Sequence, residues 1–357
     1  MLNLTKTRIF ITMIVLAAVL IAIFIVMPAG TEAIVDSEGE IIKGSIAEMK
    51  EIKLGGVDQW LLIRGEDKNN PVILMLSGGP GSSELGRFLK FNQELEKDFV
   101  VVNWEQRGCG KSFSASADKS SLTIEQYVSD VNELSEYLKT KFNKEKIYLL
   151  GHSWGTIIGT MAVQEKPENF HAYIGAAQMV NVKKTDQYMY DFVLESAKSK
   201  GEDKKVKKMI DAGPPPYFGD GMLKKYQLFL TSYADYYQAE NPFVENDSSW
   251  FNPLTMFWFD EYSFIDKINF FRGMLNTFPA VYQQLQDIDF TVQAVDLEVP
   301  VYYLIGRHDY TAKFIDDYFE RINAPKKELI YFEHSHHGEI WSESEKFHEI
   351  MINQVKK

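Results

Sequence analysis

Residues 146–163 read Lys-Ile-Tyr-Leu-Leu-Gly-His-Ser-Trp-Gly-Thr-Ile-Ile-Gly-Thr-Met-Ala-Val, and this stretch decides the fold. An apolar run typical of a buried strand leads into Gly-x-Ser-x-Gly, and a stretch typical of a helix follows. A serine on such a sharp turn has a strained backbone, and Gly151 and Gly155 let the strand and the helix approach each other. The stretch therefore predicts a nucleophile elbow that exposes Ser153 at a sheet edge, beside the first N–H groups of a helix.

The rest of the chain predicts a mainly parallel sheet with helices on both faces. Period-two alternation in residues 46–54 and 59–64 predicts an antiparallel pair of strands first. Continuous apolar runs, typical of strands buried on both faces, follow at Val72–Leu76, Phe99–Val102, Ile147–Leu150, Tyr173–Ile174, Val301–Ile305 and Leu329–Phe332. Helix-like stretches alternate with these runs, most clearly Thr123–Phe142, which opens with a capping box of Thr123 and Gln126. This alternation is typical of an α/β fold.

A long region interrupts the alternation of strands and helices. Residues 180–298 are rich in Tyr, Phe and Trp and have a mostly helical pattern. We expect a helical lid inserted over Ser153, with most of its aromatic side chains in its own core and a minority lining the pocket. The expected organisation is a cytoplasmic segment at 1–8, a membrane segment at 9–27, a linker at 28–44, a sheet domain at 45–179 and 299–357, and the lid at 180–298.

The amino-terminal region has the pattern of a membrane anchor. Residues 9–27 contain no charged side chain, and Lys6 and Arg8 precede them. A helix of about 19 residues spans the hydrocarbon core of a bilayer, which is roughly 30 Å thick. Basic residues before the segment and acidic ones after it, such as Glu32, predict a cytoplasmic N-terminus and an extracytoplasmic domain. The alternative is a cleaved signal peptide and a secreted protein, although the apolar part of such peptides is usually shorter.

Composition narrows the classes of partner and cofactor. The net charge of −12 argues against a nucleic-acid partner, because phosphate binding depends on clustered positive charge. Cys109 is the only cysteine, so an intrachain disulfide is impossible. We expect no cofactor. The oligomeric state does not follow from the sequence.

Asp309 is the favoured partner acid for Ser153. A serine hydroxyl needs a neighbouring base, which a carboxylate orients. In a sheet of this kind the order along the chain is serine, acid, histidine, and the last two follow later strands. Asp309 comes directly after the run 301–305. The alternatives are Asp296, Asp316 and Asp317, which precede that run or belong to the next helix.

Three histidines, His334, His336 and His337, follow the last apolar run. Position alone does not choose the base among them. His152 is adjacent to Ser153, but its side chain should leave the turn in another direction and pack. A metal site is not expected either, because His-x-His-His is not a typical zinc spacing.

Two loops should complete the site. Ser77-Gly-Gly-Pro-Gly-Ser-Ser83 follows the run 72–76 and can bring backbone close to a ligand. It is placed to supply a second oxyanion donor beside the N–H of Trp154. Gln106 and Arg107 follow the next run, and we expect both to brace the glycine loop through hydrogen bonds.

Together these stretches resemble the prolyl iminopeptidase group of α/β-hydrolases. That group has His-Gly-Gly-Pro-Gly, Asp-Gln-Arg-Gly-x-Gly-x-Ser and Gly-x-Ser-Trp-Gly signatures, which match residues 77–81, 105–112 and 151–155. Ser77 replaces the histidine of the first signature, and Glu105 replaces the aspartate of the second. The resemblance implies an oxyanion hole from the N–H groups of Gly79 and Trp154. It also implies His337 as the base, because residues 333–337 match that group's acidic-x-Ser-x-His pattern.

One signature of the group has no counterpart here. The Trp-Glu motif of the lid, which binds the free amine of the substrate in that group, is missing, and Glu240, Glu245 and Glu261 are the substitutes that the lid offers. Together with the predicted membrane segment, the resemblance predicts a membrane-tethered serine hydrolase that removes N-terminal residues from short peptides. The alternatives are a carboxylesterase or lactonase acting on small esters, and a non-catalytic binding protein with the same fold.

Overall fold

The computed structural model describes residues 12–13, 29–241 and 259–356. Most of the predicted membrane segment, residues 9–27, lies outside these ranges, and so does Glu245. Within the described ranges, no helix combines the length and the apolar character needed to cross a bilayer. The membrane segment therefore remains a prediction.

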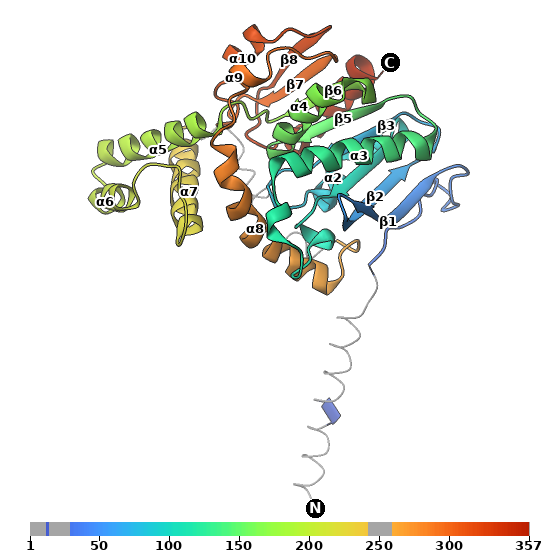
Figure 1. Cartoon of the computed structure of the whole chain (residues 1–357), viewed down its shortest axis with the longest axis horizontal. Helices are drawn as coiled ribbons and strands as arrows, with labels where there is room; N and C mark the ends of the chain where they lie inside the picture. The colour runs from blue at the N-terminus through green and yellow to red at the C-terminus, as the bar shows by residue number, and fades with distance from the viewer. Residues whose placement is uncertain (1–11, 14–28, 242–258, 357) are drawn as a thin grey trace, which may run out of the picture.

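The strands of the described chain form one eight-stranded sheet in the order β1-β2-β4-β3-β5-β6-β7-β8 (Figure 1). Strand β2 pairs antiparallel with both β1 and β4, and every other pairing is parallel. The strands are β1 (Ile46–Leu54), β2 (Val57–Gly65), β3 (Val72–Leu76), β4 (Val100–Glu105), β5 (Ile147–His152), β6 (Phe170–Ala176), β7 (Val301–Gly306) and β8 (Lys327–Phe332). The predicted mainly parallel sheet is confirmed, although β4 extends to Glu105 rather than ending at Val102.

Helices cover both faces of the sheet. Strand β3 shows how, because Val72, Leu74 and Leu76 belong to one hydrophobic cluster while Ile73 and Met75 belong to the other. The first cluster includes residues of α3 (Ile124–Phe142), α4 (Trp154–Glu165) and α10 (Ile315–Arg321). The second includes residues of α2 (Leu85–Asn92), α11 (Glu339–Ser342) and α12 (Ser344–Ile350). Short turns of 3₁₀ helix lie at η1 (Gln93–Lys97), η2 (Gly110–Ser112), η3 (Lys119–Ser121) and η4 (Pro167–Asn169), and the π-helical η7 (Met351–Val355) follows α12.

The capping box predicted for α3 is only half formed. Thr123 caps the helix, since its hydroxyl accepts a hydrogen bond from the backbone N–H of Gln126 at 3.2 Å. The side chain of Gln126 does not return to Thr123. It donates to Asp130 at 2.9 Å, because that buried carboxylate lies one turn further along the same helix.

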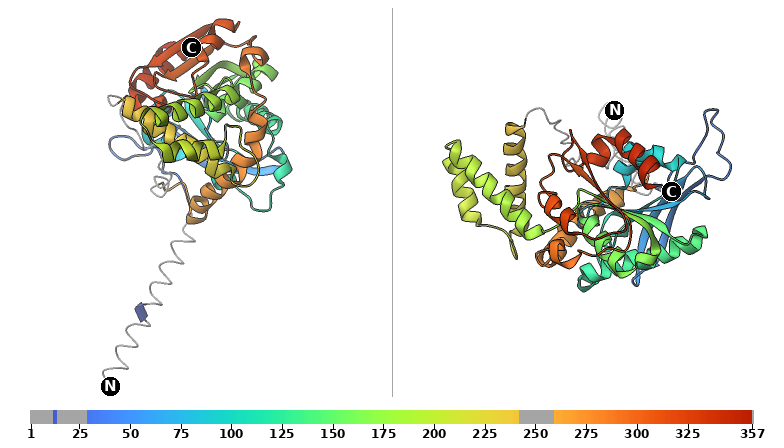
Figure 2. Two further views of the ribbon diagram at one scale, coloured as in Figure 1. Left: turned by 90° about the vertical axis from the view of Figure 1, so that its left-hand side faces the viewer. Right: turned by 90° about the horizontal axis from the view of Figure 1, so that it is seen from above.

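Further helices lie between β6 and β7, and we call this segment the insertion. They are α5 (Val182–Ser199), α6 (Asp203–Ala212), α7 (Met222–Glu240), α8 (Phe264–Leu285) and α9 (Phe290–Gln293). Helices α5, α6 and α7 project beyond the sheet at one end of the molecule, whereas α8 runs along it (Figures 1 and 2). Because β3, β4, β5, β7 and β8 run in one direction, the loops that follow these strands meet at the same sheet edge.

Candidate active site

Ser153 lies in the turn between β5 and α4, with φ 53° and ψ −120°. A positive φ is costly for a residue that carries a Cβ. The neighbouring glycines make the turn possible, since a Cβ on Gly151 would lie 2.6 Å from the carbonyl oxygen of Gly155. A Cβ on Gly155 would overlap the carbonyl oxygen of Leu76. The backbone N–H of Ser153 also donates to the carbonyl of Ala176 at 3.0 Å, which fixes the turn to β6.

The side chain of His337 lies between Ser153 and Asp309. Its Nε2 atom is 2.8 Å from the hydroxyl oxygen of Ser153, and its Nδ1 atom is 3.1 Å from each carboxylate oxygen of Asp309. The side chain of His337 is 7% exposed, and that of Asp309 is fully buried. Such a chain of contacts allows the imidazole to take a proton from the hydroxyl while the carboxylate stabilises the resulting cation.

Thr311 also holds Asp309. Its backbone N–H donates to the carboxylate at 2.8 Å, and its hydroxyl lies 2.9 and 2.8 Å from the two carboxylate oxygens. Burial raises the pKa of Asp309, but His337 and Thr311 outweigh it and lower that pKa below its usual range. Asp309 is therefore ionised at neutral pH. Thr311 is a residue of the site that was not predicted from the sequence, although an Asp side chain commonly accepts from the backbone N–H two residues further on.

The other two histidines of the last loop lie in different surroundings. His334 is exposed, and its backbone N–H donates to Glu343 at 3.1 Å. The ring of His336 lies 5.7 Å from that of Tyr237, between centroids. Of the three histidines, His337 is the one that the structure brings to Ser153.

The alternative acids are likewise held by other partners. The carboxylate of Asp296 accepts from the side chain of Asn323 at 3.4 Å, and that of Asp316 accepts from the hydroxyl of Tyr331. Asp317 is exposed on α10. Of these four acids, Asp309 is the one that forms hydrogen bonds with His337 in the described part of the chain.

Backbone groups flank Ser153 on two sides. Trp154 is the first residue of α4, so its N–H has no partner within the helix. On the other side, a Cβ placed on Gly78 would lie 3.3 Å from the Cβ of Ser153, so the glycine loop passes directly beside the serine. Gly79 follows with φ 141°, in a region that favours glycine.

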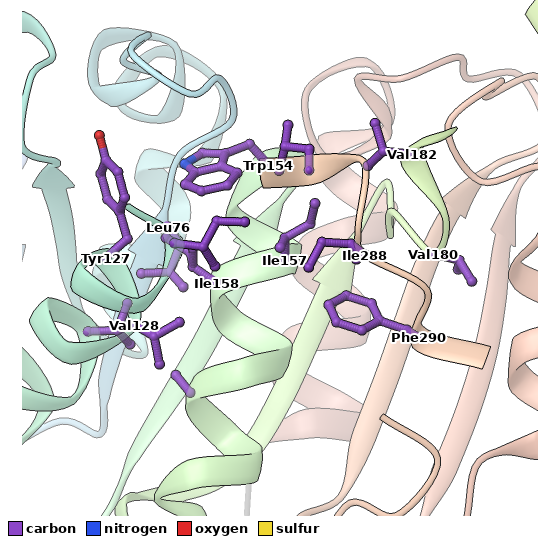
Figure 3. Packing of buried hydrophobic residues seen from close by; sticks show 14 of the residues in the cluster. Leu76, Tyr127, Val128, Trp154, Ile157, Ile158, Val180, Val182, Ile288 and Phe290 are labelled. Atoms are coloured by element: carbon purple, nitrogen blue, oxygen red, sulfur yellow. The ribbon is translucent and has the colours of Figure 1, made fainter. Parts of the chain in front are cut away.

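Gln106 joins these two sides. Its Oε1 atom accepts from the indole N–H of Trp154 at 2.9 Å, and its Nε2 atom donates to the carbonyl of Ser77 at 3.0 Å. The structure thus places Gln106 in the contact expected from the sequence. Figure 3 shows the indole of Trp154 above packed residues that include Leu76 and Ile158.

Arg107 does not brace the glycine loop, which corrects the expectation from the sequence. Its guanidinium donates to the two carboxylate oxygens of Asp130 at 2.7 and 2.8 Å, and both side chains are buried. The loop after β4 turns sharply at this point, so adjacent side chains leave it in opposite directions. Gln106 points to the site, while Arg107 points to α3.

The insertion borders the site through aromatic contacts. The ring of Tyr310 stacks on that of His337, with centroids 5.6 Å apart and 22° between the planes. Tyr233 of α7 packs edge-on against Tyr310 at 5.2 Å. The hydroxyl of Tyr237, also in α7, lies 3.0 Å from Nδ1 of His308. Helix α7 therefore contacts the loops that follow β7 and β8.

The lid glutamates proposed from the sequence lie in other surroundings. Glu240 is exposed at the end of α7 and accepts from Ser196 at 3.4 Å. Burial raises the pKa of Glu261, whose side chain faces Arg64 and Thr31 rather than Ser153. This corrects the expectation for both residues, because their contacts are with Ser196 and with Arg64 and Thr31 rather than with residues around Ser153.

Asp186 is a buried carboxyl of the insertion that the sequence analysis did not single out. The hydroxyl of Tyr282 donates to it at 2.6 Å. Burial raises the pKa of Asp186 to about 7, despite this hydrogen bond. Within the described residues, no group of three or more His, Cys, Asp or Glu side chains is arranged to hold a metal ion.

Comparison of sequences identifies relatives along most of the chain. The family model of the alpha/beta hydrolase fold matches residues 71–337. "Probable aminopeptidase YbaC" of Bacillus subtilis is 30% identical over 299 residues, which cover 83% of this chain and 92% of that protein. A proline iminopeptidase of Saccharolobus solfataricus is 25% identical over 301 residues, covering 82% of this chain and 87% of the relative.

Solved structures share the architecture. A proline iminopeptidase-related protein of Thermus thermophilus superposes with a TM-score of 0.60 at 18% identity, over 86% of this chain and 96% of the other. Potato epoxide hydrolase I superposes with a TM-score of 0.58 at 18% identity, over 87% and 99%. At such low identity the likeness concerns the fold alone. With the family match and the curated relatives, it leads to one conclusion: this chain is a hydrolase that belongs to the α/β hydrolase fold family.

Proposed function

We propose that the protein is a serine hydrolase in which Ser153 is the nucleophile, His337 the general base and Asp309 the residue that orients the imidazole. The 2.8 Å contact between Nε2 of His337 and the hydroxyl of Ser153 is the observation that carries this proposal. Ser153 attacks the substrate carbonyl while His337 takes its proton, and His337 returns that proton to the leaving group. Water then attacks the acyl group on Ser153 while His337 takes its proton, and His337 passes that proton to the oxygen of Ser153 as the acyl–oxygen bond breaks.

The oxyanion of the intermediate needs two preorganised donors. We assign this role to the backbone N–H groups of Trp154 and Gly79. The position of Trp154 at the start of α4 supports the first assignment, and the passage of the glycine loop beside Ser153 supports the second. Gln106 keeps the two donors at a fixed separation through its bonds to Trp154 and Ser77.

For the substrate we propose short peptides, from which the enzyme removes N-terminal residues. The names of the curated relatives, an aminopeptidase and a proline iminopeptidase, support this class. The same catalytic groups serve small esters and lactones, so a carboxylesterase or lactonase is the alternative. A panel of aminoacyl-arylamides, their N-acetylated forms and p-nitrophenyl esters separates the two, because only a peptidase of this kind needs a free α-amine.

A free α-amine needs an anionic partner, and we propose Asp186 for that role. Asp186 is buried in the insertion, where the hydroxyl of Tyr282 donates to it at 2.6 Å. Burial, followed by the charges of Asp309 and Asp186, raises the pKa of Tyr310, which stacks on His337. An ammonium group nearby would favour the ionised carboxylate. Asp186→Asn should raise KM for aminoacyl-arylamides and leave ester hydrolysis unchanged. Asp191→Asn, an exposed change on the same helix, is the control.

Active-site labelling tests the core proposal against the alternative of a non-catalytic binding protein. A fluorophosphonate should modify the wild type on Ser153, as mass spectrometry of the labelled peptide would reveal, and Ser153→Ala should neither react nor hydrolyse any substrate of the panel. A wild type that resists the probe and hydrolyses nothing would favour the binding protein.

We further propose that residues 9–27 tether the catalytic domain to the outer side of the cell membrane. The uncharged run behind Lys6 and Arg8 supports this topology. Blotting of membrane and medium fractions distinguishes the anchor, which keeps the full-length protein in the membrane, from a cleaved signal peptide, which releases a shorter protein into the medium.

A further inference from the structure

A buried pair of side chains, Glu84 and His152, lies behind the proposed catalytic groups. Glu84 precedes α2 and is 9% exposed, while His152 ends β5 and is 2% exposed. The Nδ1 atom of His152 lies 2.8 Å from Oε1 of Glu84. The contact differs from the sequence-based prediction, in which His152 only packs and Glu84 has no role.

Each member of the pair also contacts the backbone of one catalytic loop. The second carboxylate oxygen of Glu84 accepts from the N–H of Gly78 at 2.7 Å, in the glycine loop. The Nε2 atom of His152 lies 2.7 Å from the carbonyl oxygen of His337. One continuous chain of hydrogen bonds therefore runs from the glycine loop to the backbone of the proposed general base.

The contacts of the two side chains limit their protonation states. The Nε2 atom of His152 faces a backbone carbonyl, and Oε2 of Glu84 accepts from the N–H of Gly78, so Nδ1 of His152 and Oε1 of Glu84 share one proton. Burial opposes both charges, but Glu84 raises the pKa of His152 and His152 lowers that of Glu84, so this proton lies on His152. Glu84 and His152 thus form an ion pair, and charge-assisted hydrogen bonds of this kind are stronger than neutral ones.

From this arrangement we infer that Glu84 and His152 act as one positioning unit. It holds the glycine loop and the backbone of His337 at a fixed distance on either side of Ser153. The inference rests on the proposed function, because the backbone groups that it fixes belong to the proposed oxyanion hole and the proposed base. Both side chains are buried and bond to each other and to the backbone of Gly78 and His337, so we assign them a role through these residues.

Charged groups on several elements face His152. Burial on its own lowers the pKa of His152, but Glu84, with Glu339 of α11 and the carbonyl of His337, raises it to about 9. The ring of His337 lies 5.1 Å from that of His152, between centroids. Burial on its own raises the pKa of Glu84, but His152 lowers it. Arg87 of α2 adds to the lowering, so the pKa of Glu84 lies below its ordinary value. The pair therefore stays ionised across the neutral range.

Two variants that keep a polar side chain at each position test the unit. In Glu84→Gln, the amide NH₂ faces one of the two donors, the N–H of Gly78 or the ring N–H of His152. In His152→Gln, the side chain cannot donate to both Glu84 and the carbonyl of His337. Each should lower kcat for a p-nitrophenyl ester, and the rate of fluorophosphonate labelling, by about ten- to hundredfold with KM little changed, as expected from misplaced catalytic groups. The double variant should lose no more than the larger single loss, because the two residues act together.

Further variants separate geometry from charge. Glu84→Asp keeps the charge but is too short to reach both partners, so it should behave like Glu84→Gln. Glu339→Gln removes a buried acid that faces His152 without belonging to the chain of hydrogen bonds. Burial raises the pKa of Glu339 to about 8, so it is mostly neutral at pH 7. The Glu339→Gln variant should therefore have the kcat of the wild type at pH 7. Its thermal unfolding shows how far the replacement of a buried carboxyl by an amide destabilises the fold in itself, which is the control for Glu84→Gln.

The pH profile supplies a readout that a purely structural role would not move. The kcat of the wild type should fall as the pH rises through about 9, where His152 loses its second N–H. This fall in kcat forms the basic limb of the pH profile. The limb should move to lower pH in Glu339→Gln and be absent in His152→Gln. If Glu84→Gln does not fold, the wild-type and Glu339→Gln profiles decide by themselves.

The outcomes are distinct. Folded Glu84→Gln and His152→Gln with wild-type kcat and no change in the basic limb would overturn the positioning role, even if both unfold at lower temperature. A wild type that is neither labelled at Ser153 nor active would instead remove the proposed function and the positioning role with it.

Discussion

The Nε2 atom of His337 lies 2.8 Å from the hydroxyl oxygen of Ser153, although 184 residues separate the two along the chain. One residue follows β5 and the other follows β8, and both strands end at the same edge of the sheet. The sheet, rather than the local sequence, therefore brings the hydroxyl and the imidazole together.

Replacement of Asp309 by asparagine should lower kcat about 10⁴-fold with little change in KM, because an amide favours the wrong tautomer of the imidazole. Hydrolysis of an aminoacyl-arylamide or a p-nitrophenyl ester measures the effect. Asp316→Asn, an exposed acid of the following helix, is the matched control and should keep wild-type kcat. Loss of activity in Asp316→Asn instead would contradict the choice of Asp309.

Gly155→Ala should destabilise the protein. Its Cβ would overlap the carbonyl oxygen of Leu76, a backbone atom of β3 that cannot move without shifting the sheet. We expect a loss of about 1–3 kcal/mol or more in the free energy of unfolding, as for other overpacked cores. Gly30→Ala, where a Cβ meets nothing within 4 Å, should be nearly neutral in the same urea titration. Equal stability of the two variants would show that helix α4 can retreat from the strand.

Arg107→Met should cost about 3–5 kcal/mol, because it leaves the buried carboxylate of Asp130 without its cationic partner. Lys207→Met is the control, because it removes an exposed ion pair in which the Nζ atom of Lys207 lies 2.7 Å from a carboxylate oxygen of Asp211. Exposed pairs contribute about 0–1 kcal/mol. Chemical denaturation measures the free energy of unfolding of both variants. A small loss for Arg107→Met would mean that the other partners of Asp130 are enough to stabilise its buried charge.

The ion pair of Glu84 and His152 should make stability depend on pH. The folded-state pKa of His152, about 9, lies above its ordinary value of 6.5. A group whose pKa rises on folding stabilises the fold fully below its unfolded value and loses this contribution as the pH rises through the folded value. The difference in unfolding free energy between the wild type and His152→Gln should therefore be largest near pH 6 and shrink towards pH 10. Denaturation curves at pH 6, 8 and 10 measure it, and a difference that grows with pH would contradict the pair.

The local patterns of the sequence predicted most of the sheet. Runs such as Val72–Leu76 are typical of strands buried on both faces, and β3 contributes to both hydrophobic clusters as expected. The ends of elements were less predictable. Strand β4 continues through Asn103, Trp104 and Glu105. The indole N–H of Trp104 donates to Gln59, and the carboxylate of Glu105 accepts from Ser83 and Tyr262. Such partners come from distant segments, so no local pattern announces them.

The sequence by itself determined the elbow, because the sterics of Gly151 and Gly155 around Ser153 act over a few neighbouring bonds. It also determined the order of strands and loops that delivers an acid and a histidine to one edge. Only the tertiary structure decided the direction of each loop side chain. It brought His337 rather than His336 to Ser153, turned Arg107 towards Asp130, and joined Glu84 to His152. Those directions depend on contacts between segments far apart in the chain, and such contacts exist only once the sheet and its helices have packed.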